Sequence, residues 1–174
     1  MILIINICNE QFHYLEFVRP IEQILQKANI NFTTKHYTEL DDIESFSKII
    51  ICGTSLKDNE FRQNLSKFKF LKDYKKPILG ICAGFQIISK LLKNKTTKNQ
   101  EIGTIELNFE KEFLGLKNKN KVYSLHNNST TQGNLEVFAK SENSIQAVKH
   151  ENFYGVLFHP EVYNPELILN FAQL

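Results

Sequence analysis

The sequence predicts an α/β protein with a mainly parallel central sheet flanked by helices, to which antiparallel strands are added in the second half. Short apolar runs alternate with helical patterns in the first half, which is typical of βαβ units, and strand-like runs separated by turn residues dominate the second half. The length of 174 residues suits one domain with a sizeable core. We therefore expect residues 1–174 to form a single domain.

The first half predicts parallel strands and the helices between them. The strands are expected at Ile2 to Cys8, Phe32 to Tyr37, Lys48 to Gly53 and Pro77 to Cys82. Helices are expected over Tyr14 to Lys27, which Pro20 interrupts, over Phe61 to Leu71 and over Gln86 to Leu92. The apolar start of the chain has no basic leader and is too short to span a bilayer, so we interpret it as the first buried strand.

The second half predicts antiparallel pairs that extend the sheet before a last helix. The strand-like runs are Ile102 to Phe109, Lys121 to Leu125, Leu135 to Ala139, Ile145 to Lys149 and Tyr154 to His159, and the helix is Glu166 to Leu174. Gly53, Cys82 and His159 each end a predicted strand. Because ligands bind at the carboxyl ends of strands in open parallel sheets, we expect these residues to converge on one edge.

The composition is that of an ordinary soluble protein and argues against a nucleic-acid partner. Hydrophobic residues make up 42%, charged residues 23%, and the net charge is +2. The lysine-rich stretches Lys90 to Lys98 and Lys117 to Lys121 are interpreted as solvated loops, with docking of an acidic partner as the lesser alternative. Three cysteines without metal-ligand spacing predict a reducing, cytoplasmic compartment and no metal site.

The segment from Gly80 to Gln86 is the most informative part of the chain. It follows the end of a predicted strand and opens a predicted helix, so Cys82 lies at a strand-to-helix junction, the position of a nucleophile elbow. Gly80 and Gly84 allow close backbone approach, and the N-terminus of the helix presents unpaired N–H groups and a positive dipole end to the sulfur. Both features favour the thiolate.

A base and an acid follow the last predicted strand. Pro160 biases His159 toward an extended conformation, in which residues two apart point to the same side, so we expect Glu161 to lie beside the imidazole. Glu161 would fix the tautomer while the other ring nitrogen faces Cys82. Either residue type alone is more often structural, because free cysteines are commonly small core residues. The two motifs together favour a nucleophile and its base.

These two motifs closely resemble those of the class I (triad) glutamine amidotransferases, and the resemblance spans nearly the whole chain. It implies a flavodoxin-like fold, with Cys82 as the nucleophile, His159 as the general base and acid, and Glu161 as the residue that orients it. Gln86 matches a glutamine that helps to hold the substrate. The backbone N–H groups of Gly53 and Ala83 match the oxyanion hole.

Relatives carry a histidine beside the glutamine pocket or the partner interface at the position of His126, so the resemblance makes His126 and the preceding Leu125 candidate substrate-binding residues. The other histidines, His13, His36 and His150, are interpreted as surface or satisfied positions.

The resemblance also implies the reaction and its participants. L-Glutamine would be hydrolysed to glutamate and ammonia through a γ-glutamyl thioester, and the ammonia would pass to a separate synthetase. The sequence has no Walker-type phosphate loop, so we expect no cofactor in this chain, with ATP and magnesium only on the partner.

The identity of the partner is the more open question. The segments Glu101 to Gly103, Ile145 to His150 and Tyr154 to Val162 most resemble the glutaminase subunit of archaeal-type two-subunit GMP synthase, whose partner is an ATP-pyrophosphatase subunit. The family commonly has paired glycines where Cys52 to Lys57 has one, and the GMP-synthase-like segment after His126 usually has an aspartate where Asn128 stands. Glutaminase subunits of anthranilate or aminodeoxychorismate synthase and a standalone amidotransferase are alternatives.

Two alternatives from other classes remain open: a binding or regulatory module that has lost turnover, and an intracellular cysteine peptidase. The intact Cys82, His159 and Glu161 argue against the first alternative, and Gln86 argues against the second.

Overall fold

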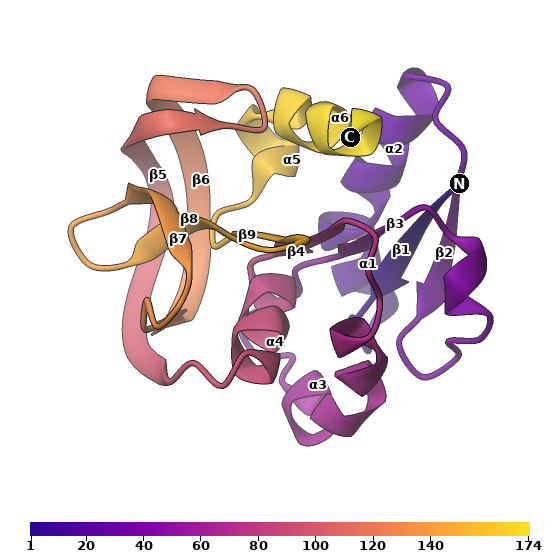
Figure 1. Ribbon diagram of the computed structural model, residues 1–174. Helices are drawn as coiled ribbons and strands as arrows, with labels where there is room; N and C mark the ends of the chain where they lie inside the picture. The colour runs from indigo at the N-terminus through magenta and orange to yellow at the C-terminus, as the bar shows by residue number, and fades with distance from the viewer.

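The computed structural model describes the whole chain, from Met1 to Leu174. At its centre is a seven-stranded sheet in the order β2-β1-β3-β4-β9-β8-β7 (Figure 1). The strands are Ile2–Asn6 (β1), Phe32–His36 (β2), Lys48–Ile51 (β3), Ile78–Ile81 (β4), Glu136–Lys140 (β7), Ile145–His150 (β8) and Phe153–Val156 (β9). Strands β2, β1, β3, β4 and β9 are parallel, whereas β8 and β7 continue the sheet antiparallel. The predicted α/β fold class is confirmed, and the order of the parallel strands is the flavodoxin-like one.

Helices cover both faces of this sheet. They are Gln11–Phe17 (α1), Arg19–Lys27 (α2), Glu60–Gln63 (α3), Ala83–Leu91 (α4), Pro160–Tyr163 (α5) and Pro165–Gln173 (α6), with short 3-10 helices at Ile43–Ser45 (η1) and Leu65–Lys72 (η2). Figure 1 shows α2 and α6 together on one side of the sheet and α3 and α4 on the other. No helix combines the length and the apolar character that crossing a bilayer requires.

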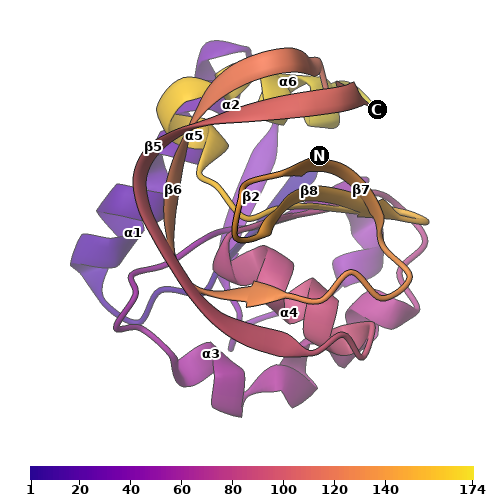
Figure 2. The ribbon, with the colours of Figure 1, turned by 90° about the vertical axis from the view of Figure 1, so that its left-hand side faces the viewer.

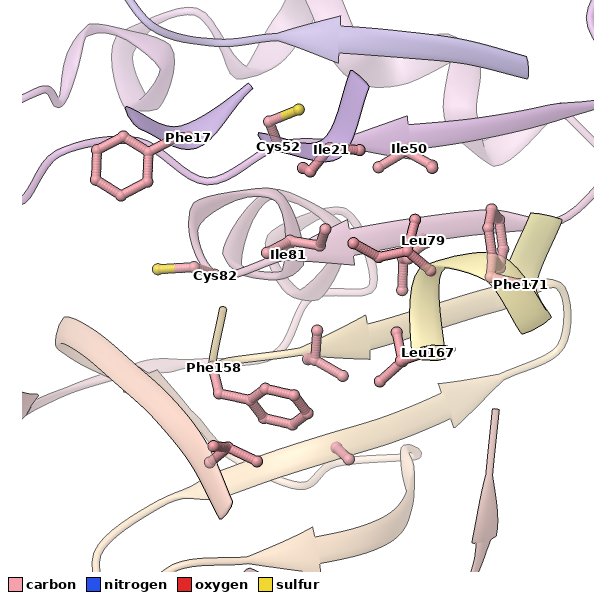
Figure 3. Close-up of a cluster of buried hydrophobic side chains, with 14 of the residues drawn as sticks. Phe17, Ile21, Ile50, Cys52, Leu79, Ile81, Cys82, Phe158, Leu167 and Phe171 are labelled. Atoms are coloured by element: carbon pink, nitrogen blue, oxygen red, sulfur yellow. The ribbon is translucent and has the colours of Figure 1, made fainter. Parts of the chain in front are cut away.

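The alternation of side chains along β1 explains why the sheet is buried on both faces. Ile2 and Ile4 belong to the cluster beneath α2 and α6, part of which Figure 3 shows. Leu3 and Ile5 belong to the cluster beneath α4 and η2. Successive side chains of a strand point to opposite faces, so a continuous apolar run is required where helices cover both faces.

The segments expected to extend the sheet at Ile102 to Phe109 and Lys121 to Leu125 do not do so. They belong to longer strands, Thr96–Phe113 (β5) and Leu116–Thr130 (β6), which pair with each other in a separate antiparallel sheet. Figure 2 shows this hairpin curving around one side of the molecule. Its buried residues, among them Leu107, Phe109 and Val122, pack on the main core, while β7 and β8 occupy the edge of the central sheet. The lysine-rich stretch Lys117 to Lys121, expected as a loop, lies in β6 and is mostly exposed.

The helix expected over Tyr14 to Lys27 is two helices. α1 ends at Phe17 and α2 begins at Arg19, with Pro20 in the first turn of α2. Proline lacks the N–H that a helix interior requires but is tolerated in the first turn, where that N–H would have no partner. The amphipathic stretch Phe61 to Leu71 is also divided, between α3 and η2.

Candidate active site

Cys82 lies on a strained turn between β4 and α4. Its backbone has φ 49° and ψ −104°, in a region that residues with side chains rarely adopt. The turn is tight because a Cβ on Gly80 would lie 2.7 Å from the backbone of both Gly84 and Phe85. The predicted close approach at these glycines is therefore present, and the sequence forms a nucleophile elbow.

Cys82 belongs to the apolar cluster drawn in Figure 3, and its sulfur points away from Ile81 and Leu79 of that cluster. The Sγ atom lies 3.4 Å from the carbonyl oxygen of Leu125, to which the thiol donates, so the β5–β6 hairpin supplies one wall of the site. Burial raises the pKa of Cys8 to about 12 and that of Cys52 well above its ordinary value. These two thiols are therefore uncharged at neutral pH.

His159 follows β9 and hydrogen bonds to Glu161, with 2.7 Å between Nδ1 and Oε1. Both side chains are almost completely buried. His159 is extended, as Pro160 predicts, but Glu161 lies in the first turn of the short helix α5 rather than on a strand. The two side chains thus lie side by side as expected, but the turn into α5 brings them together, and not the alternation of side chains along a strand.

The three strand ends predicted to converge lie together. A Cβ added to Gly53 would be 2.7 Å from Cε1 of His159 and 3.4 Å from Cβ of Cys82, so Gly53 lies against both residues. Nε2 of His159 is buried and has no hydrogen-bond partner. Burial alone would lower the pKa of His159, but the charges of Glu161 and of a Cys82 thiolate outweigh it and raise the pKa well above its ordinary value. This environment favours an imidazolium beside the sulfur.

Backbone donors are available on both sides of Cys82. The N–H of Gly53 donates no hydrogen bond within the protein. Ala83 is the first residue of α4, and the first N–H groups of a helix have no acceptor within it. Two such donors beside a nucleophile are the elements of an oxyanion hole.

A small cleft opens in front of Cys82. Its lining includes the predicted Ala83, Gln86, Leu125 and His126, but not His159. Gln86 is held by both ends of its amide: Oε1 accepts from Nη2 of Arg62 at 2.9 Å, and Nε2 donates to the carbonyl of Asn128 at 3.2 Å.

His126 is buried in a polar cluster at the wall of the cleft. Its Nδ1 lies 3.1 Å from the carbonyl of Asn99, and its Nε2 lies 3.4 Å from both Glu101 and Gln146. Burial lowers the pKa of His126, so the neutral ring donates from Nδ1 to Asn99 and accepts at Nε2 from Gln146. These bonds join the hairpin to β8 next to Leu125, the acceptor for Cys82.

Sequence reasoning did not identify Asp58 and Arg62, which also line the cleft. Asp58 is buried and accepts hydrogen bonds from the backbone N–H and side-chain amide of Asn9 and from the hydroxyl of Thr54. It therefore joins the loop after β3 to the loop after β1. Only the position of Asp58 at the end of a loop next to Gly53 could have indicated this role. Of the remaining histidines, His13 contacts Asp58, and His36 and His150 contact polar side chains outside the cleft.

The chain resembles known proteins in both sequence and fold. Residues 13–167 match the family model described as glutamine amidotransferase class-I. The chain is 35% identical over 156 residues to a subunit of glutamine-hydrolyzing GMP synthase from Pyrococcus abyssi, covering 79% of this chain and 81% of that protein. It is 31% identical over 164 residues to pyridoxal 5'-phosphate synthase subunit PdxT from Methanosphaera stadtmanae, covering 84% and 83%.

The fold has a similar counterpart among solved structures. A Thermoplasma acidophilum protein assigned provisionally as a subunit of GMP synthase superposes with a TM-score of 0.83, covering 99% of this chain and 92% of that one at 21% identity. At this identity the likeness concerns the fold.

Proposed function

The chain belongs to the class I glutamine amidotransferase family, and from this premise we propose that Cys82, His159 and Glu161 hydrolyse L-glutamine and that the ammonia passes to a synthetase partner. The main support is the convergence at Gly53, which lies against both the Cys82 Cβ and the His159 ring, whose Nε2 has no hydrogen-bond partner. A structural cysteine would need neither the strained elbow nor the buried base.

The proposed reaction has two halves. In the first, the Cys82 thiolate attacks the side-chain carbonyl carbon of glutamine, and the N–H groups of Gly53 and Ala83 hold the resulting oxyanion. The C–N bond breaks, His159 donates its proton to the departing ammonia, and a γ-glutamyl thioester remains. In the second, His159 takes a proton from water, the hydroxide attacks the thioester and the C–S bond breaks to release glutamate.

Glu161 keeps His159 in position through both halves. Its carboxylate accepts from Nδ1, so Nε2 is the nitrogen that exchanges protons with the reactants. The carboxylate also stabilises the imidazolium that forms when water is deprotonated. The chain's own residues carry out the reaction without a cofactor, and ATP and magnesium would be bound by the synthetase.

The synthetase we propose is the ATP-pyrophosphatase subunit of a two-subunit GMP synthase. The support is the similarity to the Pyrococcus abyssi GMP synthase subunit, which recurs in the corresponding subunits from Methanosphaera stadtmanae and Thermococcus kodakarensis at 38% and 34% identity. A PdxT-like role is the second candidate, because that relative is 31% identical over a comparable share of the chain. We further propose a reducing, cytoplasmic setting, in which the three free cysteines would remain reduced.

The test of the glutaminase is chemical trapping on Cys82. Purified protein is incubated with L-glutamine, released glutamate is measured, and the covalent intermediate is located by mass spectrometry after acid quenching. The proposal expects a γ-glutamyl adduct on Cys82 alone, since the thiols of Cys8 and Cys52 are uncharged at neutral pH. Cys82→Ser should form no adduct and release no glutamate while remaining folded. Equal labelling of all three cysteines would contradict the assignment.

A further inference from the structure

We propose that Arg62 binds the α-carboxylate of the substrate and thereby makes the site selective for a free amino acid over a glutamine side chain in a peptide. This proposal rests on the proposed glutaminase function and adds a substrate-binding residue to it. Arg62 lies in α3, lines the same cleft as Cys82, and reaches Gln86 with Nη2 at 2.9 Å.

The charge of Arg62 has no counterion in the protein. None of the ion pairs of the structure involves Arg62, whereas Arg19, the other arginine of the sequence, pairs with Glu22 at 3.1 Å. The one side-chain acceptor that holds the guanidinium is the neutral amide of Gln86. Because a guanidinium has five donors, it can keep this bond and still offer a pair of N–H groups to a carboxylate.

Arg62 lies where the active-site cleft borders a second cavity. Arg62, Phe61 and Gln86 line both the active-site cleft and a neighbouring cavity, so they form the boundary at which the cleft ends on that side. Cys82 must meet the side-chain carbonyl carbon, and three carbon atoms separate that carbon from the α-carboxylate. A substrate extended from the sulfur along Gln86 therefore brings its carboxylate toward the guanidinium.

The presence of an arginine at this position indicates a residue that binds a carboxylate, rather than one that only adds charge to the surface. The cationic side chains of this chain are almost all lysines, and an arginine stands at this one place on the cleft. Arginine presents a planar fork that matches a carboxylate, whereas lysine acts as a point charge. Burial lowers the pKa of Arg62, and a Cys82 thiolate opposes that lowering, which agrees with the two groups sharing one cleft.

The experiment compares two substrates across matched variants. Glutamate or ammonia release is measured for L-glutamine and for its α-carboxamide analogue, which lacks the negative charge, with wild type, Arg62→Gln, Arg62→Lys and the control Arg19→Gln. We expect Arg62→Gln to raise KM for L-glutamine by roughly 10- to 100-fold with little change in kcat, because the contact is made equally in ground and transition states. KM for the α-carboxamide should stay nearly unchanged, so the preference for L-glutamine disappears.

The other variants separate binding from structural effects. Arg62→Lys should restore part of the preference, and Arg19→Gln, which removes the same charge from α2, should behave like wild type. Thermal unfolding is measured for each variant. An unchanged KM for L-glutamine in Arg62→Gln, or an equal rise in KM for both substrates, would overturn the role of Arg62. A wild-type protein that releases no glutamate would instead overturn the proposed function, and this assignment with it.

Discussion

His159 lies between the Glu161 carboxylate, 2.7 Å from Nδ1, and the Cys82 thiol, and both raise its pKa against the opposing effect of burial. The protonation of His159 therefore depends on its two neighbours, Glu161 and Cys82. Glu161 is buried with one of its oxygens unpartnered, so its only compensation inside the protein is the bond to His159. The pair is therefore a structural unit as well as the proposed catalytic one, and the protonation of His159 reports on both.

Replacing Glu161 with glutamine should shift the pH dependence of the enzyme in one direction. Loss of the carboxylate removes the largest contribution that raises the pKa of His159, so the imidazolium is lost at a lower pH. The alkaline limb of the pH–rate profile should move to lower pH, with residual activity left because the amide still hydrogen bonds to the ring. The profile is measured by glutamate release across acidic to alkaline pH, and an unmoved alkaline limb would contradict the role given to Glu161.

Gly53 is predicted to be required for space as well as for its N–H. In Gly53→Ala the new methyl group would meet Cε1 of His159 at 2.7 Å, so the ring or the loop must move and the geometry between His159 and Cys82 changes. A misplacement of the catalytic base by about 1 Å costs roughly 100-fold in kcat/KM. The overpacking itself lowers the stability of the protein by about 1–3 kcal/mol. Lys57→Ala, an exposed change in the same loop, is the control. Wild-type turnover by a folded Gly53→Ala protein would contradict this geometry.

At the scale of elements, the loop from Cys52 to Asp58 is fixed by Asp58 rather than by paired glycines. Asp58→Ala leaves the donors of Asn9 and Thr54 without an acceptor, and buried unpaired donors cost about 1–3 kcal/mol. We expect Asp58→Ala to have a lower free energy of unfolding in urea than wild type. It should also lose more glutaminase activity than the control variant, because the loop carries Gly53. The control is Asp73→Ala, an exposed aspartate at the end of η2. Equal effects of the two changes would remove the special role of Asp58.

Local sequence patterns predicted the strands and the helix around the site, but they did not predict which distant strands pair with each other. The alternation of apolar and amphipathic runs predicted β1, β3, β4 and α4, because each buries its pattern against its sequence neighbours. The β5–β6 hairpin was placed wrongly, since a period of two indicates a strand but does not say which strand it pairs with.

The site shows the same division between local and long-range information. The elbow at Cys82 and the neighbourhood of His159 and Glu161 are encoded within a few residues, so the sequence predicted them. The acceptor at Leu125, the anchor at Asp58 and the bond from Arg62 to Gln86 each join segments brought together only by the fold. No local pattern carries that information.

At the scale of the whole molecule, an almost complete site faces a cleft, and the proposed function assigns the use of the ammonia to a separate synthetase. Ammonia released there without a partner would be lost to solvent. The groups that could respond to docking lie close to the cleft: the Cys52 to Asp58 loop with its free Gly53 N–H, and the β5–β6 hairpin that supplies Leu125. A partner that contacts either segment could change the geometry around Cys82 without touching the cysteine itself.

We therefore predict that the free chain is a slow glutaminase and that its synthetase accelerates it. If the Gly53 N–H is misdirected in the free chain, the loss of one oxyanion donor slows turnover by about 100- to 1,000-fold, and docking should restore it. Glutamate release is measured for the chain alone and with the ATP-pyrophosphatase subunit of GMP synthase plus its nucleotide substrates. Stimulation of at least roughly tenfold, about 1.4 kcal/mol, supports the coupling. Stimulation should be weaker in Asp58→Ala, whose loop is no longer anchored, than in Asp73→Ala. If that subunit has no effect and a PdxT-type synthase partner stimulates instead, the assignment moves to the second candidate.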